Sequence, residues 1–234
     1  MTQFRLVVDE AVLRRYPDYT LLVIYAEGIQ NGPSNTASSA YLRDAEEYQR
    51  QALAGKQPSL HPHIAAWRQT HSSFGLKANK FLCSVEALLK RVLKNQDLPR
   101  INRLVDFYNA ISLRYVLPVG GEDWDKIESD VVLKESAGRE SFVSSVNHVE
   151  MTSYPEPGEI IWADLAGVTC RAWNWRQGQR TMLTESTHNA YFVLDRLAPY
   201  PLADLQGAQT ELTRILREEA GASRVWSETF GARR

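Results

Sequence analysis

Residues 20–26 read Thr-Leu-Leu-Val-Ile-Tyr-Ala, and the six residues after Thr20 are all apolar. A strand with one face in water alternates apolar and polar residues, so an unbroken apolar run indicates a strand in the middle of a sheet. The run is also far shorter than the roughly 20 residues that a membrane-spanning helix needs. The sequence therefore predicts a protein built around a central strand, with no membrane partner.

The N-terminus and the cysteines bear on the cellular compartment. Residues 1–5 lack the charged-then-apolar layout of a secretory signal. Cys83 and Cys170 form no C-x-x-C pair, so neither a disulfide framework nor a thiolate zinc site is expected. We therefore expect a cytoplasmic protein.

Helical and strand-like patterns are distributed unevenly along the chain. Apolar residues at the helical period predict helices over residues 38–53, 63–72, 84–93, 102–114 and 202–220. Short apolar runs bounded by Gly, Pro, Asn and Asp predict strands over residues 4–8, 20–26, 115–119, 131–134, 141–143, 159–163, 168–175 and 190–194. The expected fold class is α+β, in one domain over residues 1–234, with a helical N-terminal half and a strand-rich C-terminal half.

The charged residues are segregated, although the formal net charge is only −1. Residues 77–103 carry seven basic and two acidic side chains, whereas residues 104–170 carry four basic and twelve acidic ones. The near-neutral total argues against binding a polyanion by bulk charge, but it is compatible with a local basic face. The acidic block, which includes the turn expected at 122–125, should face away from such a partner.

Motifs of the common catalytic classes are absent from the sequence. It has no Walker phosphate loop, no Gly-rich dinucleotide motif, no H-E-x-x-H and no G-x-S-x-G. His61, His63 and His71 are expected to be exposed near a proline-flanked turn and not to bind a metal. Cys170 is expected to be a small buried hydrophobe and not a nucleophile paired with His188. We expect neither a metal nor a cofactor.

Asp106 and Asn109 lie three residues apart on one face of the helix predicted over 102–114. They could present a polar pair to a pocket. Internal capping and hydrogen bonding to the sheet also suit buried Asp and Asn well. From spacing alone, the structural interpretation is favoured.

The run from Cys170 to Gln177 also has two interpretations. In an extended strand, Arg171, Trp173 and Trp175 would share one face, with Asn174 and Arg176 on the other. Tryptophans beside arginines can stack on a base and pair with phosphate. Arginine stems lying over indoles on an ordinary sheet face are equally common. The residues alone leave both interpretations open.

Taken together, these segments resemble the B-three/B-four module, the tRNA-editing part of the bacterial phenylalanyl-tRNA synthetase beta chain. The resemblance is carried by residues 84–93, 98–113, 117–123 and 132–140. Residues 170–177, followed by Thr184 and residues 187–189, are similar to free-standing single-module relatives. The match spans residues 60–200 and is specific as a concatenation of segments.

The resemblance implies a mixed β-sheet flanked by helices. The module would form a core over residues 60–200, with the strands and helices of residues 1–59 and a helix over 201–220 packed on it. It also implies a pocket for the 3′ end of a misacylated tRNA, whose ester is hydrolysed by a positioned water without a covalent nucleophile. Orienting water beside an already activated ester could suffice, which agrees with the missing catalytic motifs. The expected partner is tRNA and not DNA.

The resemblance further implies which residues form the site. The candidate catalytic residues, which would shape the pocket or orient water, are Asn109, Asn174 and Thr187. The candidate substrate-binding residues are Arg103, Pro118, Gly120, Arg171, Trp173, Trp175 and Arg176. Phosphates of the tRNA would meet the arginines at 171 and 176 and the lysines Lys77, Lys80, Lys90 and Lys94. Binding through so small a basic segment should be weak and salt-sensitive.

Two departures from the synthetase module leave other hypotheses open. Gly120 stands where that module usually has a histidine, and the run from Trp173 replaces a Gly-rich stretch. The chain could therefore be a non-catalytic module that binds an acceptor stem or an amino acid. It could also be a structural or partner-binding protein that keeps only the fold.

Overall fold

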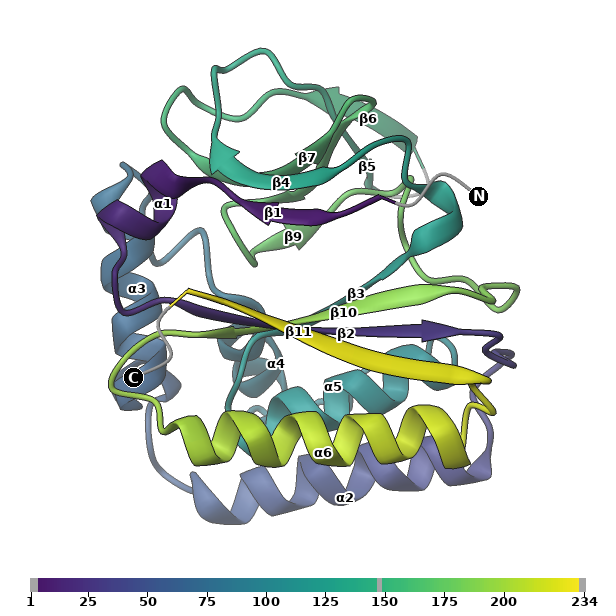
Figure 1. The fold of residues 1–234 in the computed structure, drawn as a ribbon. Helices are drawn as coiled ribbons and strands as arrows, with labels where there is room; N and C mark the ends of the chain where they lie inside the picture. Colours follow the sequence, from purple (N-terminus) through teal and green to yellow (C-terminus); the bar gives the residue numbers. More distant parts are fainter. Residues whose placement is uncertain (1–3, 147–148, 232–234) are drawn as a thin grey trace.

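The strands lie in three sheets, with most of the helices on one side of them (Figure 1). The computed structural model describes residues 4–146 and 149–231. The helices are α1 (Glu10–Arg15), α2 (Thr36–Ala52), α3 (Pro62–Ser73), α4 (Ser84–Val92), α5 (Arg103–Tyr115) and α6 (Leu202–Glu218). The strands are β1 (Leu6–Val8), β2 (Thr20–Glu27), β3 (Val119–Asp123), β4 (Val131–Glu135), β5 (Phe142–Val146), β6 (Val149–Ser153), β7 (Ile160–Asp164), β8 (Gly167–Arg171), β9 (Arg176–Gln177), β10 (Ala190–Arg196) and β11 (Arg224–Gly231).

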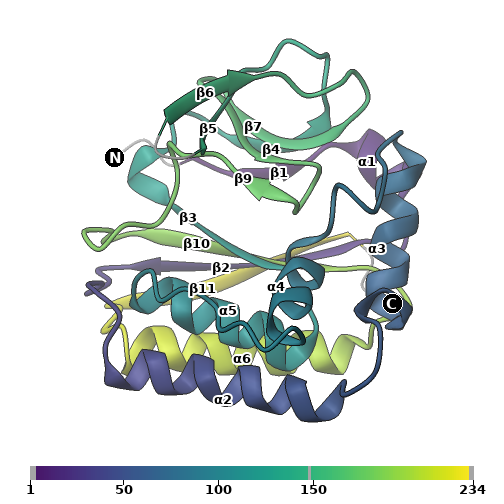
Figure 2. The same cartoon turned by 180° about the vertical axis from the view of Figure 1, so that it is seen from behind.

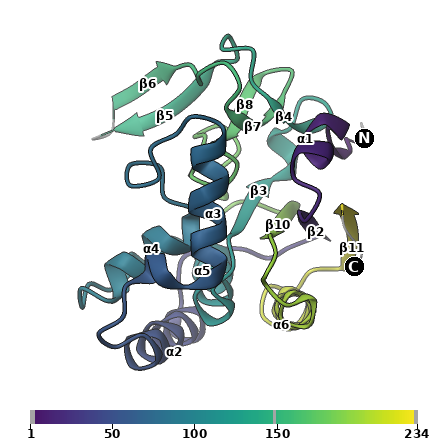
Figure 3. The same ribbon diagram turned by 90° about the vertical axis from the view of Figure 1, so that its left-hand side faces the viewer.

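Two of the sheets stack on each other, and helices cover the outer face of one of them. The upper sheet in Figure 1 has the order β1-β4-β7-β8-β9, with β1 parallel to β4 and the other pairs antiparallel. The lower sheet has the order β11-β2-β10-β3, and β5 pairs with β6 as a separate hairpin. Figure 3 shows α2, α5 and α6 on the far side of the lower sheet from β4, β7 and β8. The predicted α+β fold, a mixed sheet flanked by helices, is confirmed.

The apolar run at 20–26 forms β2, which lies between β11 and β10 as predicted. Its side chains alternate between two cores because successive residues of a strand point to opposite faces. Leu21 and Val23 pack in the core shared with the upper sheet, and Leu22 and Ile24 pack against α5 and α6. Within the described residues, no helix combines the length and the hydropathy needed to span a bilayer.

Some elements differ from the sequence prediction. The strand expected at 115–119 begins only at Val119, because α5 continues to Tyr115 and ends at Val116 in a left-handed conformation (φ 48°). The elements α1, β6, β9 and β11 were not predicted. α1 has six residues, too few to show a helical period, and β11 is an edge strand with a largely exposed side-chain pattern.

The prediction that His63 and His71 are exposed is wrong, because both side chains are buried. The Nδ1–H of His63 donates to the Val116 carbonyl (3.0 Å), and its Nε2 accepts from the indole N–H of Trp67 (3.1 Å). Burial lowers the pKa of His63 to about 4. His71 Nδ1 bonds to the Phe81 carbonyl (2.9 Å). Neutral imidazoles with such partners can be buried at little cost.

Candidate functional site

A cavity of about 140 Å³ lies between the two stacked sheets. Its walls come from β3, β10, β7, β8 and β9, from the first half of α4 and from the middle of α5. Figure 2 shows β3, β10, β7, β9, α4 and α5 from behind. The predicted site residues that line it are Asn109, Gly120, Trp173, Asn174, Trp175 and Arg176. Lining residues that the sequence did not suggest as site residues include Tyr108, Glu122, Trp162, Cys170, Tyr191 and Asp195. The two segments singled out in the sequence, in α5 and at 170–177, therefore meet at one cavity.

The two polar residues predicted on one face of α5, Asp106 and Asn109, have different surroundings in the structure. Asp106 is buried and accepts from the hydroxyl of Ser38 (2.8 Å) and the backbone N–H of Ile101 (3.4 Å), as the structural interpretation expects. Asn109 is half-buried and lines the cavity. The spacing in the sequence placed both residues on one face of the helix. It could not show that Asp106 is buried in hydrogen bonds whereas Asn109 lines a cavity.

The extended strand predicted over 168–175 is wrong, because β8 ends at Arg171. Ala172 and Trp173 both have positive φ angles, 46° and 65°, and this left-handed pair turns the chain. The turn directs Trp173 into the core, where it is fully buried and makes edge contacts with Tyr19 (ring centroids 4.7 Å apart) and Trp67 (5.4 Å). The two faces expected from strand alternation therefore do not exist.

Asn174 is held by a buried hydrogen-bond network beside the cavity. Its Nδ2 donates to Asp195 Oδ2 (3.2 Å), and the Tyr19 hydroxyl donates to Asp195 Oδ1 (2.6 Å). Burial raises the pKa of Asp195 to about 6. Burial lowers the pKa of His71, and a contact with the Asn174 side chain opposes this in part. Among the described residues, neither Asn174 Oδ1 nor His71 Nε2 has a hydrogen-bond donor. Asn174 lines the cavity, whereas His71 lies fully buried beside it and outside the lining.

Glu122 is the second buried acid of the cavity. It lies on β3 directly opposite Tyr191 of β10, whose hydroxyl donates to Glu122 Oε2 (2.5 Å). Burial raises the pKa of Glu122 to about 7. No lysine or arginine among the described residues forms an ion pair with Glu122 or Asp195. The cavity therefore carries acid groups without a fixed counter-ion.

The expectation that residues 122–125 form a turn facing away from a partner is wrong at its first two positions. Glu122 and Asp123 belong to β3, and both are buried. The short helical turn that follows begins only at Trp124. Strand pairing with β10 places these acids inside the molecule.

Two of the predicted arginines are already paired within the protein. Arg171 makes two hydrogen bonds to the buried carboxylate of Glu159, at 2.9 and 2.6 Å. Arg103 Nη2 donates to the carbonyl of Gln30 (2.5 Å) at the start of α5. Neither residue lines the cavity. Their guanidinium groups have structural partners within the protein, and their role in substrate binding stays a prediction.

Two further candidates also lie outside the cavity lining. Pro118 is buried before β3, and its carbonyl accepts from the backbone N–H of Asp195 (3.0 Å). Thr187 is buried, and its hydroxyl donates to Asp123 Oδ2 (2.7 Å). Pro118 therefore supports the strand that carries Asp195, and Thr187 stabilises the loop before β10.

An exposed basic and aromatic rim surrounds Trp175. The guanidinium of exposed Arg176 lies 5.0 Å from the Trp175 ring centroid, and Phe81 makes an edge contact with the same indole (4.5 Å). Lys77 and Lys80, on the turn that leads into Phe81, are both exposed. These cations are free to approach a polyanion near the cavity.

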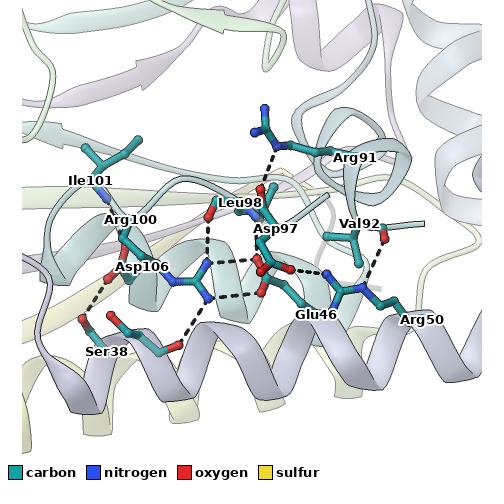
Figure 4. Close-up of polar contacts among 11 residues, drawn as sticks. Ser38, Glu46, Arg50, Arg91, Val92, Asp97, Leu98, Arg100, Ile101 and Asp106 are labelled. Carbon is teal, nitrogen blue, oxygen red and sulfur yellow. Dashed lines mark hydrogen bonds and ion pairs between the residues drawn. The ribbon is translucent and has the colours of Figure 1, made fainter. Parts of the chain in front are cut away.

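Several basic side chains in residues 77–103 already form ion pairs or hydrogen bonds within the protein. Arg100 makes a bidentate ion pair with buried Glu46, and Figure 4 shows this pair between α2 and the segment before α5. Arg91 Nε donates to the Asp97 carbonyl (2.9 Å). Lys90 pairs with buried Glu86 (3.0 Å), which makes it a poor candidate for a phosphate contact. The net charge counted over residues 77–103 is therefore larger than the positive charge available to a binding partner.

Stability should fall between pH 5 and pH 8 because of the buried acids. The pKa of Glu122 rises from 4.5 to about 7 on folding, so the folded state keeps a proton that the unfolded chain has released. This stabilisation is complete below the unfolded pKa and is lost as the pH rises through the folded pKa, a change on the order of 3 kcal/mol. Glu122→Gln should therefore show a smaller drop in Tm between these pH values. Equal drops in calorimetry of both proteins would contradict the assignment.

The fold and cavity define an α+β protein that can enclose a small chemical group between two sheets. The model of the B3/4 domain matches residues 66–209, and the chain belongs to this family. The resemblance seen in the sequence is thereby confirmed. Among the described residues, no three His, Cys, Asp or Glu side chains are grouped to hold a metal ion.

One solved structure similar to this chain is an N-terminal fragment of the phenylalanyl-tRNA synthetase beta subunit from Pyrococcus horikoshii. The similarity covers 99% of this chain and 57% of that one, with a TM-score of 0.49 and 12% sequence identity. The chain thus spans little more than half of that fragment. No curated protein matches the chain. The single domain over residues 1–234 stays a prediction.

Proposed function

We propose that the protein hydrolyses the aminoacyl ester of a misacylated tRNA. The observation that carries the proposal is the convergence of Asn109, Asn174, Trp175 and Arg176 on one cavity. These residues come from the segments that resemble the tRNA-editing module, and membership of the B3/4 family supports the same reaction class. The cavity would receive the aminoacyl group, and the rim would meet the 3′ end of the tRNA.

The proposed mechanism uses a water positioned by Asn174. A water that donates to Asn174 Oδ1 would satisfy this acceptor and direct a lone pair at the ester carbonyl. Asp195 fixes the orientation of the Asn174 amide, because the amide Nδ2 is the donor to that carboxylate. As the water attacks, it gives up one proton to solvent, and the ester oxygen of the tRNA 3′ end takes up one proton and leaves as a hydroxyl. An activated ester needs no covalent nucleophile for this step.

The experiment that tests the function is a deacylation screen. Purified protein is incubated with a panel of mischarged tRNAs, and the surviving ester is followed against buffer alone. We expect at least one ester to be lost faster than in buffer. Survival of every ester for as long as in buffer would refute the proposal.

Binding of tRNA should depend on the rim. Replacing Arg176, Lys77 and Lys80 together with glutamate should raise the Kd for tRNA by about tenfold or more, because each phosphate contact contributes through counterion release. Filter binding at several salt concentrations would measure both the Kd and its salt slope. Lys56→Glu, at an exposed position after α2, is the matched control. An unchanged Kd and slope in the triple variant would remove the rim from the interface.

A second candidate function is binding without catalysis, and Gly120 favours it. Gly120 lies opposite Val193, whose side chain lines the cavity, and a Cβ at Gly120 would be 3.5 Å from Val193 Cγ2. This distance is an ordinary van der Waals contact, so the structure has room for a Cβ at position 120, where this chain has a glycine. Calorimetry that shows affinity for an uncharged acceptor stem or an amino acid, without deacylation, would favour this function.

A further inference from the structure

The cavity combines buried acids with aromatic walls. Glu122 and Asp195 supply the acids, and Tyr108, Trp162 and Tyr191 are among the aromatic residues. A buried carboxylate is costly unless an opposite charge accompanies it, and aromatic faces attract cations. Such walls are suited to a group that carries a positive charge.

Among the described residues that line the cavity, Arg176 is the one basic residue, and its side chain is exposed. Arg176 lies at the exposed rim over Trp175, and Arg180 is paired with Asp164 (2.5 Å). The Cys170 thiol beside the acids stays neutral, because burial and Glu122 raise its pKa well above the usual value. The interior is therefore acidic or neutral, and a cation must come from a ligand.

Glu122 is the better placed of the two acids to receive this cation. Both Asp195 oxygens already accept hydrogen bonds, from Tyr19 and from Asn174. Glu122 accepts from the Tyr191 hydroxyl through Oε2 and has the Thr169 and Thr181 hydroxyls beside it, but it has more exposed surface than Asp195 (7% against 0%). A cationic group that enters the cavity would therefore meet Glu122.

The size of the cavity limits what can enter. The cavity volume of about 140 Å³ is small for a ligand site, so a short unbranched side chain suits it better than a large ring system. A lysine or ornithine side chain is of this kind and ends in an ammonium group.

We propose that the cavity selects an aminoacyl group whose side chain ends in an alkylammonium, with Glu122 as its counter-ion. This inference rests on the proposed function for the identity of the ligand as an amino-acid ester. The selection itself is a property of the cavity and can be measured without hydrolysis.

The test compares two esters of the same shape. Isothermal titration calorimetry at pH 8 measures binding of L-lysine methyl ester and L-norleucine methyl ester, which share an α-amino group and differ at the end of the side chain. We expect lysine ester to bind at least about tenfold more tightly, as for other close buried charge pairs. Equal affinities, or binding of neither ester, would overturn the inference.

Variants separate Glu122 from the rest of the cavity. Glu122→Gln should remove the preference for the lysine ester, whereas Glu185→Gln, at an exposed position, should keep it. A preference that survives in Glu122→Gln would overturn the inference. Thermal unfolding of each variant confirms that it is folded.

The pH dependence provides a measurement on the wild-type protein. The groups facing Glu122 include Tyr191 from β10, Cys170 from β8, Tyr108 from α5 and, at longer range, Arg180. Burial raises the pKa values of both tyrosines and the thiol, so these groups stay neutral between pH 6 and pH 8. Asp195, with a pKa of about 6, titrates at the lower end of this range, and the same measurement on Glu122→Gln isolates the part that belongs to Glu122. Binding of lysine ester should therefore weaken several-fold from pH 8 to pH 6 as Glu122 gains a proton. A constant ratio of the two ester affinities over this range would count against Glu122.

The tests distinguish this inference from the proposed function. Lysine-ester preference without deacylation of any mischarged tRNA would retain the selection and refute the hydrolase. Deacylation confined to tRNAs that carry uncharged side chains would retain the hydrolase and refute the selection.

Discussion

Replacing Glu46 with alanine should lower the free energy of unfolding by about 3–5 kcal/mol, the usual cost of removing one partner of a buried ion pair. Glu46 is fully buried on α2 and accepts from Arg100 Nη1 (3.0 Å), Arg100 Nη2 (3.1 Å) and the backbone N–H of Leu98 (2.7 Å). Figure 4 shows that these contacts join α2 to the segment just before α5. The variant leaves a guanidinium and a backbone donor without their acceptor.

Chemical unfolding of wild type and variant would measure this loss. Glu47→Ala removes a carboxylate from the exposed neighbouring position of α2 and should change stability by less than about 0.5 kcal/mol. A Glu46→Ala protein as stable as Glu47→Ala would show that the pair contributes little.

Replacing Asn174 with alanine should reduce hydrolysis of the mischarged tRNA by about 10²–10³-fold, the range found when one oriented polar group is removed from an active site. The substitution removes an acceptor proposed to hold the attacking water. It also removes the donor to Asp195 Oδ2, which should destabilise the fold by about 1–3 kcal/mol. The single-turnover rate measures the first effect, and thermal unfolding measures the second.

Gln206→Ala is the matched control for this substitution, because it truncates an exposed amide on α6, which lies outside the cavity lining. It should leave the single-turnover rate unchanged. A folded Asn174→Ala protein with the wild-type rate would exclude Asn174 from the chemical step.

The regular elements could be predicted because their patterns depend on local burial. The apolar run at Leu21–Ala26 has core on both faces of β2, and the apolar spacing along α5 matches its buried side. These patterns hold wherever the element sits, so a single sequence was enough to find them. Elements with mostly exposed residues, such as β11, leave a weaker pattern.

The turn after Arg171 could not be predicted, because its cause is tertiary. Left-handed φ angles at Ala172 and Trp173 are unfavourable for residues with a Cβ and are not suggested by the residue types. The buried indole of Trp173 packs against Tyr19 and Trp67, which come from distant parts of the chain. Packing of this kind can outweigh the local preference.

Glu122 and Asp195 could not be recognised as cavity residues from the sequence, because their place in the cavity depends on which strands pair and in which register. Glu122 was assigned to a turn, whereas pairing of β3 with β10 places it opposite Tyr191. Asp195 did leave a signal, as a single acid directly after the apolar run predicted at 190–194. Spacing along one chain does not show which strands lie side by side, so the two acids could not be joined to one site.

The tryptophans of the cavity wall should make the intrinsic fluorescence of the protein sensitive to ligand binding. Trp162, Trp173 and Trp175 all line the cavity, and they are three of the six tryptophans in the chain. Indole emission responds to nearby charge and to exclusion of water, so a cation entering beside Glu122 should change the intrinsic fluorescence without any label. Stopped-flow mixing could then separate binding of the proposed aminoacyl substrate from the proposed hydrolysis of its ester.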